Sequence, residues 1–148
     1  MGLFGTDEVV EEKQEESVVS MEEAKKQRKP YHVWTVAGKE HKMLLTTQEI
    51  LKLEDKYRTN LINLVTTESI PTLSVMLTFA KGSMVHWENG ISDKVIKDLY
   101  DAWMKENNGN QQQFYLEVIM PMMMVSGFFT ESQVQEITEG LQEMQNRR

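Results

Sequence analysis

The stretch YHVWTVAGKEHKMLLTT, residues 31–47, decides the fold, because strand-forming residues gather here and helix-type patterns fill the chain after it. Residues 33–36, VWTV, are β-branched or aromatic and favour a strand. The following AGKE contains a glycine suited to a turn, and HKMLL can return as a second strand. The pattern predicts a β-hairpin. A hairpin alone is only marginally stable, so we expect this one to pack on the rest of the chain.

The next segment, residues 46–57, predicts a helix. Thr46 followed by Glu49 forms a capping-box pattern, which satisfies free backbone N–H groups at a helix start. Apolar residues recur at helical spacing and predict one buried face, made of Ile50, Leu53 and Tyr57 with Leu51 beside them.

Two longer helices are predicted at 69–90 and 91–109. Pro71 suits the first turn of the central helix, 69–90. Backbone N–H groups in the first turn have no hydrogen-bond partner within the helix, so proline loses no bond there. Ser92 is the expected N-cap of the next helix, and Gly109 is the expected stop. The apolar stripe of this second helix is made of Val95, Leu99, Ala102 and Trp103.

Two further helices complete the chain. Residues 111–129 are predicted to be helical with a kink at Pro121, because proline lacks the backbone N–H donor. Thr130 and Gln133 then cap a last helix, whose apolar residues are spaced 3, 4 and 3 as in a narrow coiled-coil seam. The four seam residues are Val134, Ile137, Leu141 and Met144.

The predicted fold is α+β and mostly α, with an N-terminal β-hairpin packed on a bundle of about five helices. Residues 1–30 precede it and carry eight acidic and five basic side chains. Such a segment buries too little apolar surface to offset its ordering entropy, which predicts a disordered tail. The chain therefore divides into a flexible charged tail (1–30), a hairpin plus helical domain (31–129) and a C-terminal amphipathic acidic helix (130–148).

Composition argues against several kinds of site and partner. The chain has no cysteine, which removes disulfides, thiolate metal sites and cysteine nucleophiles. Its net charge is −7, and no Lys or Arg lies between Lys105 and Arg147, so the C-terminal third would repel nucleic acid. No apolar run approaches the ~20 residues that a membrane-spanning helix needs. We expect neither a nucleic-acid partner nor a membrane partner.

The common catalytic motifs are missing from the sequence. It has no Gly-rich phosphate loop, no His-Glu-x-x-His and no nucleophile elbow. His32 and His41 could face each other across the hairpin and bind a metal, but we favour the interpretation that both lie on its solvated side. His86 is interpreted as a packed or surface residue of the central helix. The sequence therefore predicts a protein that is not an enzyme, with no cofactor and no metal site.

The stretch PMMMVSGFF, residues 121–129, has two interpretations. Methionine is unbranched and polarisable, so it fills irregular gaps in a core. The same adaptability suits a surface that must accept varied partners. The partner-binding hypothesis involves Met122, Met123, Met124, Phe128 and Phe129, with the seam Val134, Ile137, Leu141 and Met144 as a second contact. On this hypothesis, replacing Met122–Met124 with serine lowers partner binding more than it lowers fold stability.

The order of elements and several short phrases resemble the tail assembly chaperones of long-tailed, siphovirus-type bacteriophages and prophages of Gram-positive bacteria. The phrases are LTTQEILKLE (45–54), NGIS (89–92), DLYD (98–101) and SGFF (126–129), and the likeness covers residues 31–129. The resemblance implies a protein without active site or cofactor that binds the tape-measure protein and keeps it soluble while the tail tube assembles. It also implies action in the host bacterial cytoplasm and absence from the mature virion.

The resemblance implies the tape-measure protein as partner and the tail tube protein as a second one, and the apolar seam suggests self-association. Two other functions stay open. A structural virion component, such as a head–tail adaptor, would use the same small mixed fold but remain in the particle. A small regulatory enzyme or metal protein would be built on the hairpin histidines, and the metal content of untagged protein would test it.

Overall fold

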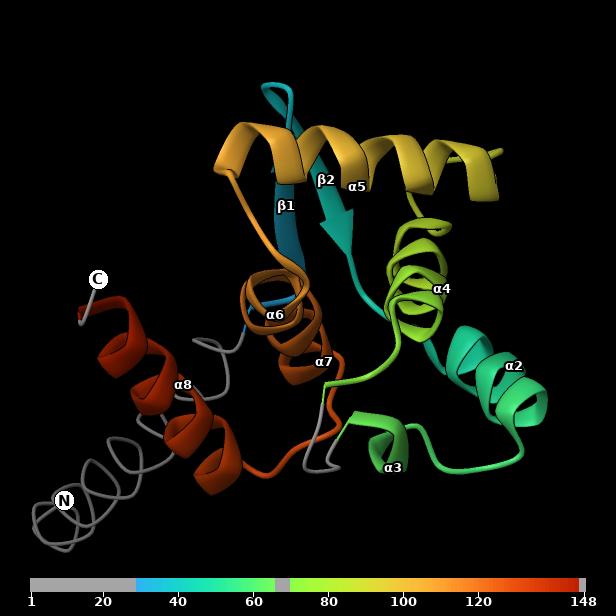
Figure 1. The fold of residues 1–148 in the computed structure, drawn as a ribbon. Helices are drawn as coiled ribbons and strands as arrows, with labels where there is room; N and C mark the ends of the chain where they lie inside the picture. The colour runs from blue at the N-terminus through green and yellow to red at the C-terminus, as the bar shows by residue number, and fades with distance from the viewer. Residues whose placement is uncertain (1–28, 66–69, 147–148) are drawn as a thin grey trace, which may run out of the picture.

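The computed structural model describes residues 29–65 and 70–146 of the 148-residue chain. The predicted disordered tail falls almost wholly outside these residues. The described part is mostly helical with a two-stranded antiparallel hairpin, which confirms the predicted fold class (Figure 1). In chain order the elements are β1 (His32–Val36), β2 (Lys39–Met43), α2 (Thr47–Tyr57), α3 (Ile62–Val65), α4 (Leu73–Met84), α5 (Asp93–Asn107), α6 (Gln111–Phe114), the π-helical turn η1 (Tyr115–Ile119), α7 (Met120–Val125) and α8 (Glu131–Asn146).

The hairpin turns on two residues, Ala37 and Gly38, whose φ angles are 51° and 77°. Positive φ at both positions is typical of a type I′ turn, whose twist matches that of the strands it joins. Glu106 on α5 holds this turn, because its Oε1 accepts a hydrogen bond from Ala37 N at 2.5 Å. The register pairs Trp34 with His41, and both side chains are buried, so this face of the hairpin points into the molecule.

Five of the described helices begin with a side-chain cap. In each, the cap oxygen accepts a hydrogen bond from the backbone N–H three residues further on. The caps are Thr46, Thr72, Ser92, Asn110 and Thr130. The expected capping box at the start of α8 is present with both of its hydrogen bonds, since Thr130 N also donates to Gln133 Oε1 at 2.9 Å. Pro71 lies before the Thr72 cap and not in the first turn, so the central helix is shorter than predicted and ends at Met84.

Two predicted apolar faces need correction. Leu51 is 60% exposed, so it does not extend the buried face of α2. On α5, Val95 is exposed and the buried residues are Ile96, Tyr100 and Trp103. Trp103 is buried as predicted, and Leu99 and Ala102 are half-buried against the core. The buried side of α5 is therefore centred nearer Ile96 and Tyr100 than the predicted stripe, because the Tyr100 ring packs into the core.

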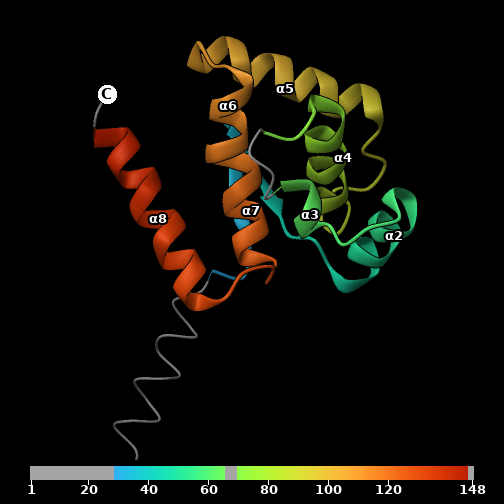
Figure 2. The same ribbon diagram turned by 60° about the horizontal axis from the view of Figure 1, so that its bottom comes forward.

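The core lies where the hairpin, α4, α5 and the continuous helix α6–η1–α7 meet. Figure 2 shows α4 and α6–η1–α7 side by side, with α5 crossing both. Phe114 is fully buried, and its ring centroid lies 5.6 Å from that of Trp34, 4.8 Å from that of Tyr100 and 5.5 Å from that of Trp103. These angled aromatic contacts join β1, α5 and α6 into one cluster.

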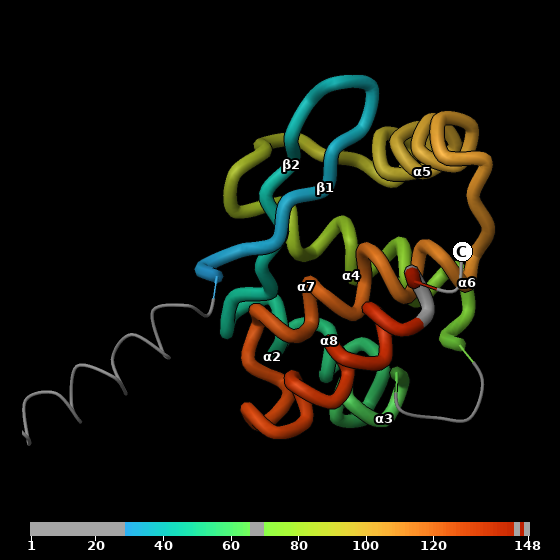
Figure 3. The backbone as a smooth tube through the Cα atoms, turned by 90° about the vertical axis from the view of Figure 1, so that its left-hand side faces the viewer, coloured from blue at the N-terminus to red at the C-terminus, as the bar shows by residue number. Residues whose placement is uncertain are grey.

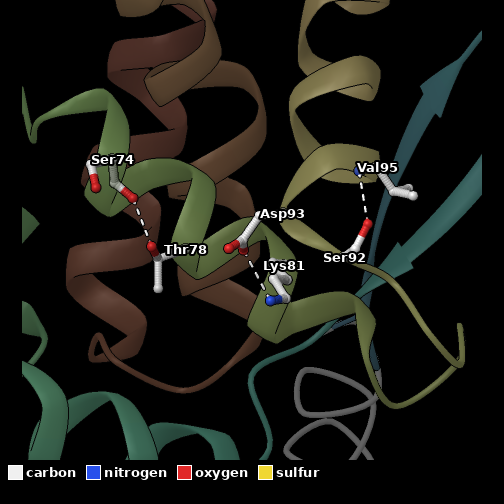
Figure 4. Close-up of polar contacts among 6 residues, drawn as sticks. All are labelled: Ser74, Thr78, Lys81, Ser92, Asp93 and Val95. Carbon is white, nitrogen blue, oxygen red and sulfur yellow. Dashed lines mark hydrogen bonds and ion pairs between the residues drawn. The ribbon is translucent and has the colours of Figure 1, made fainter.

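An ion pair links α4 to the start of α5. Lys81 Nζ lies 3.0 Å from Asp93 Oδ1, and this hydrogen bond and charge lower the pKa of the Asp93 carboxyl (Figure 4). Beside it, the Ser92 hydroxyl accepts a hydrogen bond from Val95 N at 3.2 Å. Because Asp93 is exposed, water and salt screen the pair, and its contribution to stability is small.

Candidate functional site

The PMMMVSGFF stretch is divided between the core and the surface. Met122 and Met123 are fully buried, at 0% exposure, and belong to the main core. Met124 is half-buried outside that core, whereas Phe128 and Phe129 are half-buried and packed against it. The core interpretation therefore applies to Met122 and Met123, and the side chains of the other three residues are partly accessible.

The partner-binding hypothesis expects serine at Met122 and Met123 to lower binding more than stability. Because both residues are buried, we expect the opposite. Each substitution removes buried apolar atoms and places a hydroxyl in the core, so we expect a loss of about 2–5 kcal/mol of unfolding free energy. Met124→Ser is the matched control, with an expected loss below about 1 kcal/mol because Met124 lies outside the core. Thermal unfolding of the three single variants measures this difference. Equal midpoints for all three would contradict the assignment.

A Schellman motif ends α7 at the glycine of this stretch. Gly127 has φ 89°, a left-handed conformation that glycine adopts without steric cost. Gly127 N donates to Met124 O, and Phe128 N donates to Met123 O. The motif turns the chain away from the helix and directs the Phe128 ring back against the core.

Ser126 links the C-terminal end of α7 to the loop after the hairpin through a hydrogen bond. Its hydroxyl accepts a hydrogen bond from Leu45 N at 2.9 Å and donates one to Met122 O at 2.7 Å. The residue thus satisfies a backbone N–H far away in the sequence and a carbonyl at the end of its own helix. The position of α7 relative to the hairpin is therefore fixed at this end.

At the predicted kink, the structure has the π-helical turn η1, in which Met120 N bonds to Tyr115 O five residues back. Because Pro121 has no N–H, the Glu117 carbonyl four residues earlier loses its α-helical donor. The His32 ring makes a hydrogen bond to the Glu117 backbone. Sequence reasoning missed this link, although a proline four residues after Glu117 was the signal that its carbonyl needed another donor.

His32 is mostly buried between the hairpin and this helix. Burial, the largest cause, and the positive charge of Lys29 lower the pKa of its imidazole from 6.5 to about 4. The hydrogen bond to the Glu117 backbone acts in the opposite direction and raises the pKa, because it favours the charged ring. Near neutral pH the ring is therefore uncharged, and it serves as a connection between β1 and η1.

His41 is the second histidine of the hairpin, and it is 4% exposed. Its Nδ1 lies 2.7 Å from Glu88 Oε2. The prediction that His32 and His41 lie on the solvated side is wrong, because alternation places both on the same side as Trp34, whose ring is buried. Within residues 29–65 and 70–146, no three His, Asp or Glu side chains are grouped so that they could hold a metal ion.

The helix α6–η1–α7 has a second apolar side, which sequence reasoning did not single out. Leu116, Met120 and Met124 recur every four residues and so share one side of the helix, which we call the outer face. None of them belongs to the main core, yet Met120 is only 7% exposed. The spacing was visible in the sequence, but the equally apolar core side of the same helix concealed it.

The final helix, α8, lies outside the main core and alongside α7 in Figures 1 and 2. Its predicted seam residues Val134, Ile137 and Leu141 are half-buried, and the side chain of Met144 lies outside the described part. Every hydrogen bond that the described residues show for α8 lies within the helix or its cap, and none of their ion pairs involves it. Its exposed carboxylates are Glu131, Glu136, Glu139 and Glu143.

The candidate site is made of apolar side chains on α7, on the segment after it and on α8. The outer face, Phe128, Phe129 and the α8 seam are apolar, and the exposed side of α8 carries carboxylates. No helix in the described part is long and apolar enough to cross a membrane. No protein family model, curated protein or solved structure matches this chain.

Proposed function

We propose that this protein is a tail assembly chaperone of a siphovirus-type phage or prophage, which binds the tape-measure protein and keeps it soluble while the tail tube assembles. The observation that carries the proposal is the sequence resemblance over residues 31–129. This function needs no cofactor and no catalytic residue. It places the chain in the host bacterial cytoplasm during assembly and outside the mature virion, with the tail tube protein as a second partner.

The chemistry of the apolar surface supports the proposal. A chaperone for a long apolar helix needs side chains that adapt to their client, and two of the three outer-face residues are methionines. An amphipathic client helix binds such a surface by laying its apolar side into it. The net charge of −7 keeps the complex in solution and suits a basic client. Met122 and Met123 contribute only as the core that positions Met124, Phe128 and Phe129.

Co-expression with the tape-measure protein encoded just downstream tests the proposal. We expect the client to become soluble and to co-purify with this chain. Met124→Ser is expected to reduce the co-purified client about tenfold, because one methionine buried at an interface contributes ~1–2 kcal/mol. Leu51→Ser is the control, since Leu51 is exposed on α2 and should leave client recovery unchanged.

An insoluble client, with this chain eluting alone, would contradict the chaperone function. The structural virion component would then be favoured, and mass spectrometry of purified particles would test it. Abundance of the chain in the particle supports a head–tail adaptor. Its absence from the particle agrees with a chaperone that leaves before the tail is complete.

A further inference from the structure

The helix α6–η1–α7 is apolar on two opposite sides. Phe114, Val118 and Met122 belong to the main core, whereas the outer face of Leu116, Met120 and Met124 does not. A helix that is apolar all round is stable only when both sides are covered. The main core covers one side. Because Met120 is only 7% exposed, another part of the chain covers the other side.

The described helix that lies beside α7, on the side away from α4, is α8 (Figures 1 and 2). Figure 3 views the molecule from the side on which α8 lies, and there α8 is in front of α7. Its apolar residues Val134, Ile137 and Leu141 are half-buried, although none belongs to the main core. On a helix these residues share one side, and Glu136, Glu139 and Glu143 lie on the other. The seam is thus the side of α8 that is partly covered.

We propose that α8 is a detachable lid on the outer face, and that an amphipathic partner helix displaces it and takes its place. The occupant is a helix of the same pattern as α8, with apolar residues at positions i, i+3 and i+7, because α8 is the helix that lies beside α7. The seam of α8 is then not a second client contact but a built-in competitor of the client. That the displacing helix belongs to the tape-measure protein rests on the proposed function.

The way α8 is attached permits this displacement. The described residues show no hydrogen bond or ion pair from α8 to the rest of the chain, so we attribute its position to the half-buried apolar seam. Phe128 and Phe129 pack against the core, so displacement of α8 needs to move the chain only from Thr130 onward. The Thr130–Gln133 capping box satisfies the first N–H groups of α8 from within the helix, so its start needs no partner from the body.

The lid sets the apparent affinity for any partner helix. When the binding surface is free only part of the time, the apparent affinity falls in proportion to the fraction of molecules that are open. Weakening the contact of α8 should therefore strengthen binding of a competing helix. If α8 were instead a second client contact, the same change would weaken binding. The two possibilities predict opposite signs.

The test uses the full chain and a synthetic peptide of residues 129–148, labelled with fluorescein at its N-terminus. The opened variant carries Ile137→Ser and Leu141→Ser, and the matched control carries Gln135→Ser and Gln142→Ser on exposed positions of the same helix. We expect the opened variant to bind the peptide at least about tenfold more tightly than the wild type, which follows from a larger open fraction. The control should bind like the wild type, and Met120→Asp added to the opened variant should abolish binding.

Near-UV circular dichroism of the buried Trp34 and Trp103 reports whether the main core is intact in each variant. Unchanged spectra with the expected order of affinities support the lid. Loss of the spectrum in the opened variant would overturn it, since α8 would then belong to the core. An intact variant that binds no peptide would overturn it as well. The peptide assay contains no tape-measure protein, so peptide binding without rescue of the tape-measure protein removes only the proposed function.

Discussion

Replacing Phe114 with alanine is expected to destabilise the protein by about 3–5 kcal/mol, the range seen when a fully buried aromatic residue is truncated. Phe114 has 0% exposure, and its ring is surrounded by those of Trp34, Tyr100 and Trp103. The substitution therefore leaves a cavity between the hairpin, α5 and α6 and removes three aromatic contacts at once. Because a domain of this size is stable by only ~5–15 kcal/mol, a large share of its stability would be lost.

Urea unfolding followed by tryptophan fluorescence measures the effect of Phe114→Ala. Leu51→Ala is the control, because the Leu51 side chain is 60% exposed and its truncation should change stability by less than about 0.5 kcal/mol. Phe114→Leu should fall between the two, since leucine fills part of the cavity. A loss below about 1 kcal/mol for the alanine variant would show that Phe114 is not central to the core.

Stability is expected to fall by up to about 3 kcal/mol as the pH is lowered from 6.5 to about 4, because of His32 alone. Burial and the nearby Lys29 hold the pKa of His32 at about 4 in the folded protein, against 6.5 in the unfolded chain. Between these values the unfolded state binds more protons than the folded state. The free energy of unfolding therefore rises with pH across this window, and the contribution of His32 is complete above 6.5.

Carboxylates also titrate near pH 4, so the contribution of His32 is isolated by comparison with His32→Gln. Glutamine can still donate a hydrogen bond to the Glu117 carbonyl, but it does not titrate. The variant should lose most of the pH dependence between 6.5 and 4, while His86→Gln, at an exposed position, should retain it. Urea unfolding at half-unit steps of pH provides the data. Parallel curves for wild type and His32→Gln would exclude a neutral, buried His32.

Local features of the fold were predictable from the sequence because short-range chemistry decides them. The hairpin turn needs positive φ at Ala37 and Gly38, and its position followed from the glycine between two strand-forming segments. The caps Thr46, Ser92 and Thr130 followed from hydroxyls placed three residues before the N–H groups that they satisfy. Each of these features depends on residues within one turn of each other.

Features that depend on distant residues were not predictable in this way. Three consecutive methionines are chemically identical, yet Met122 and Met123 are core while Met124 lies on the outer face. The two hairpin histidines face inward because Trp34 does, and the sequence did not say which face of a two-stranded hairpin the body would cover. The same uncertainty concerned α5, where Ile96 and Tyr100 are buried and the predicted Val95 is exposed.

The sequence by itself determined where elements begin and end, because caps, turns and proline act through neighbouring backbone groups. Only the tertiary structure decided which apolar residues are core, because burial depends on what arrives from elsewhere in the chain. The Glu117 carbonyl illustrates both kinds of effect. Pro121 has no N–H, so the carbonyl lacks its α-helical donor, which is a local effect. His32 supplies another donor from the hairpin, which is a tertiary effect. The place of α8 beside α7 was decided in the same way, because it depends on where the helix α6–η1–α7 lies in the folded chain.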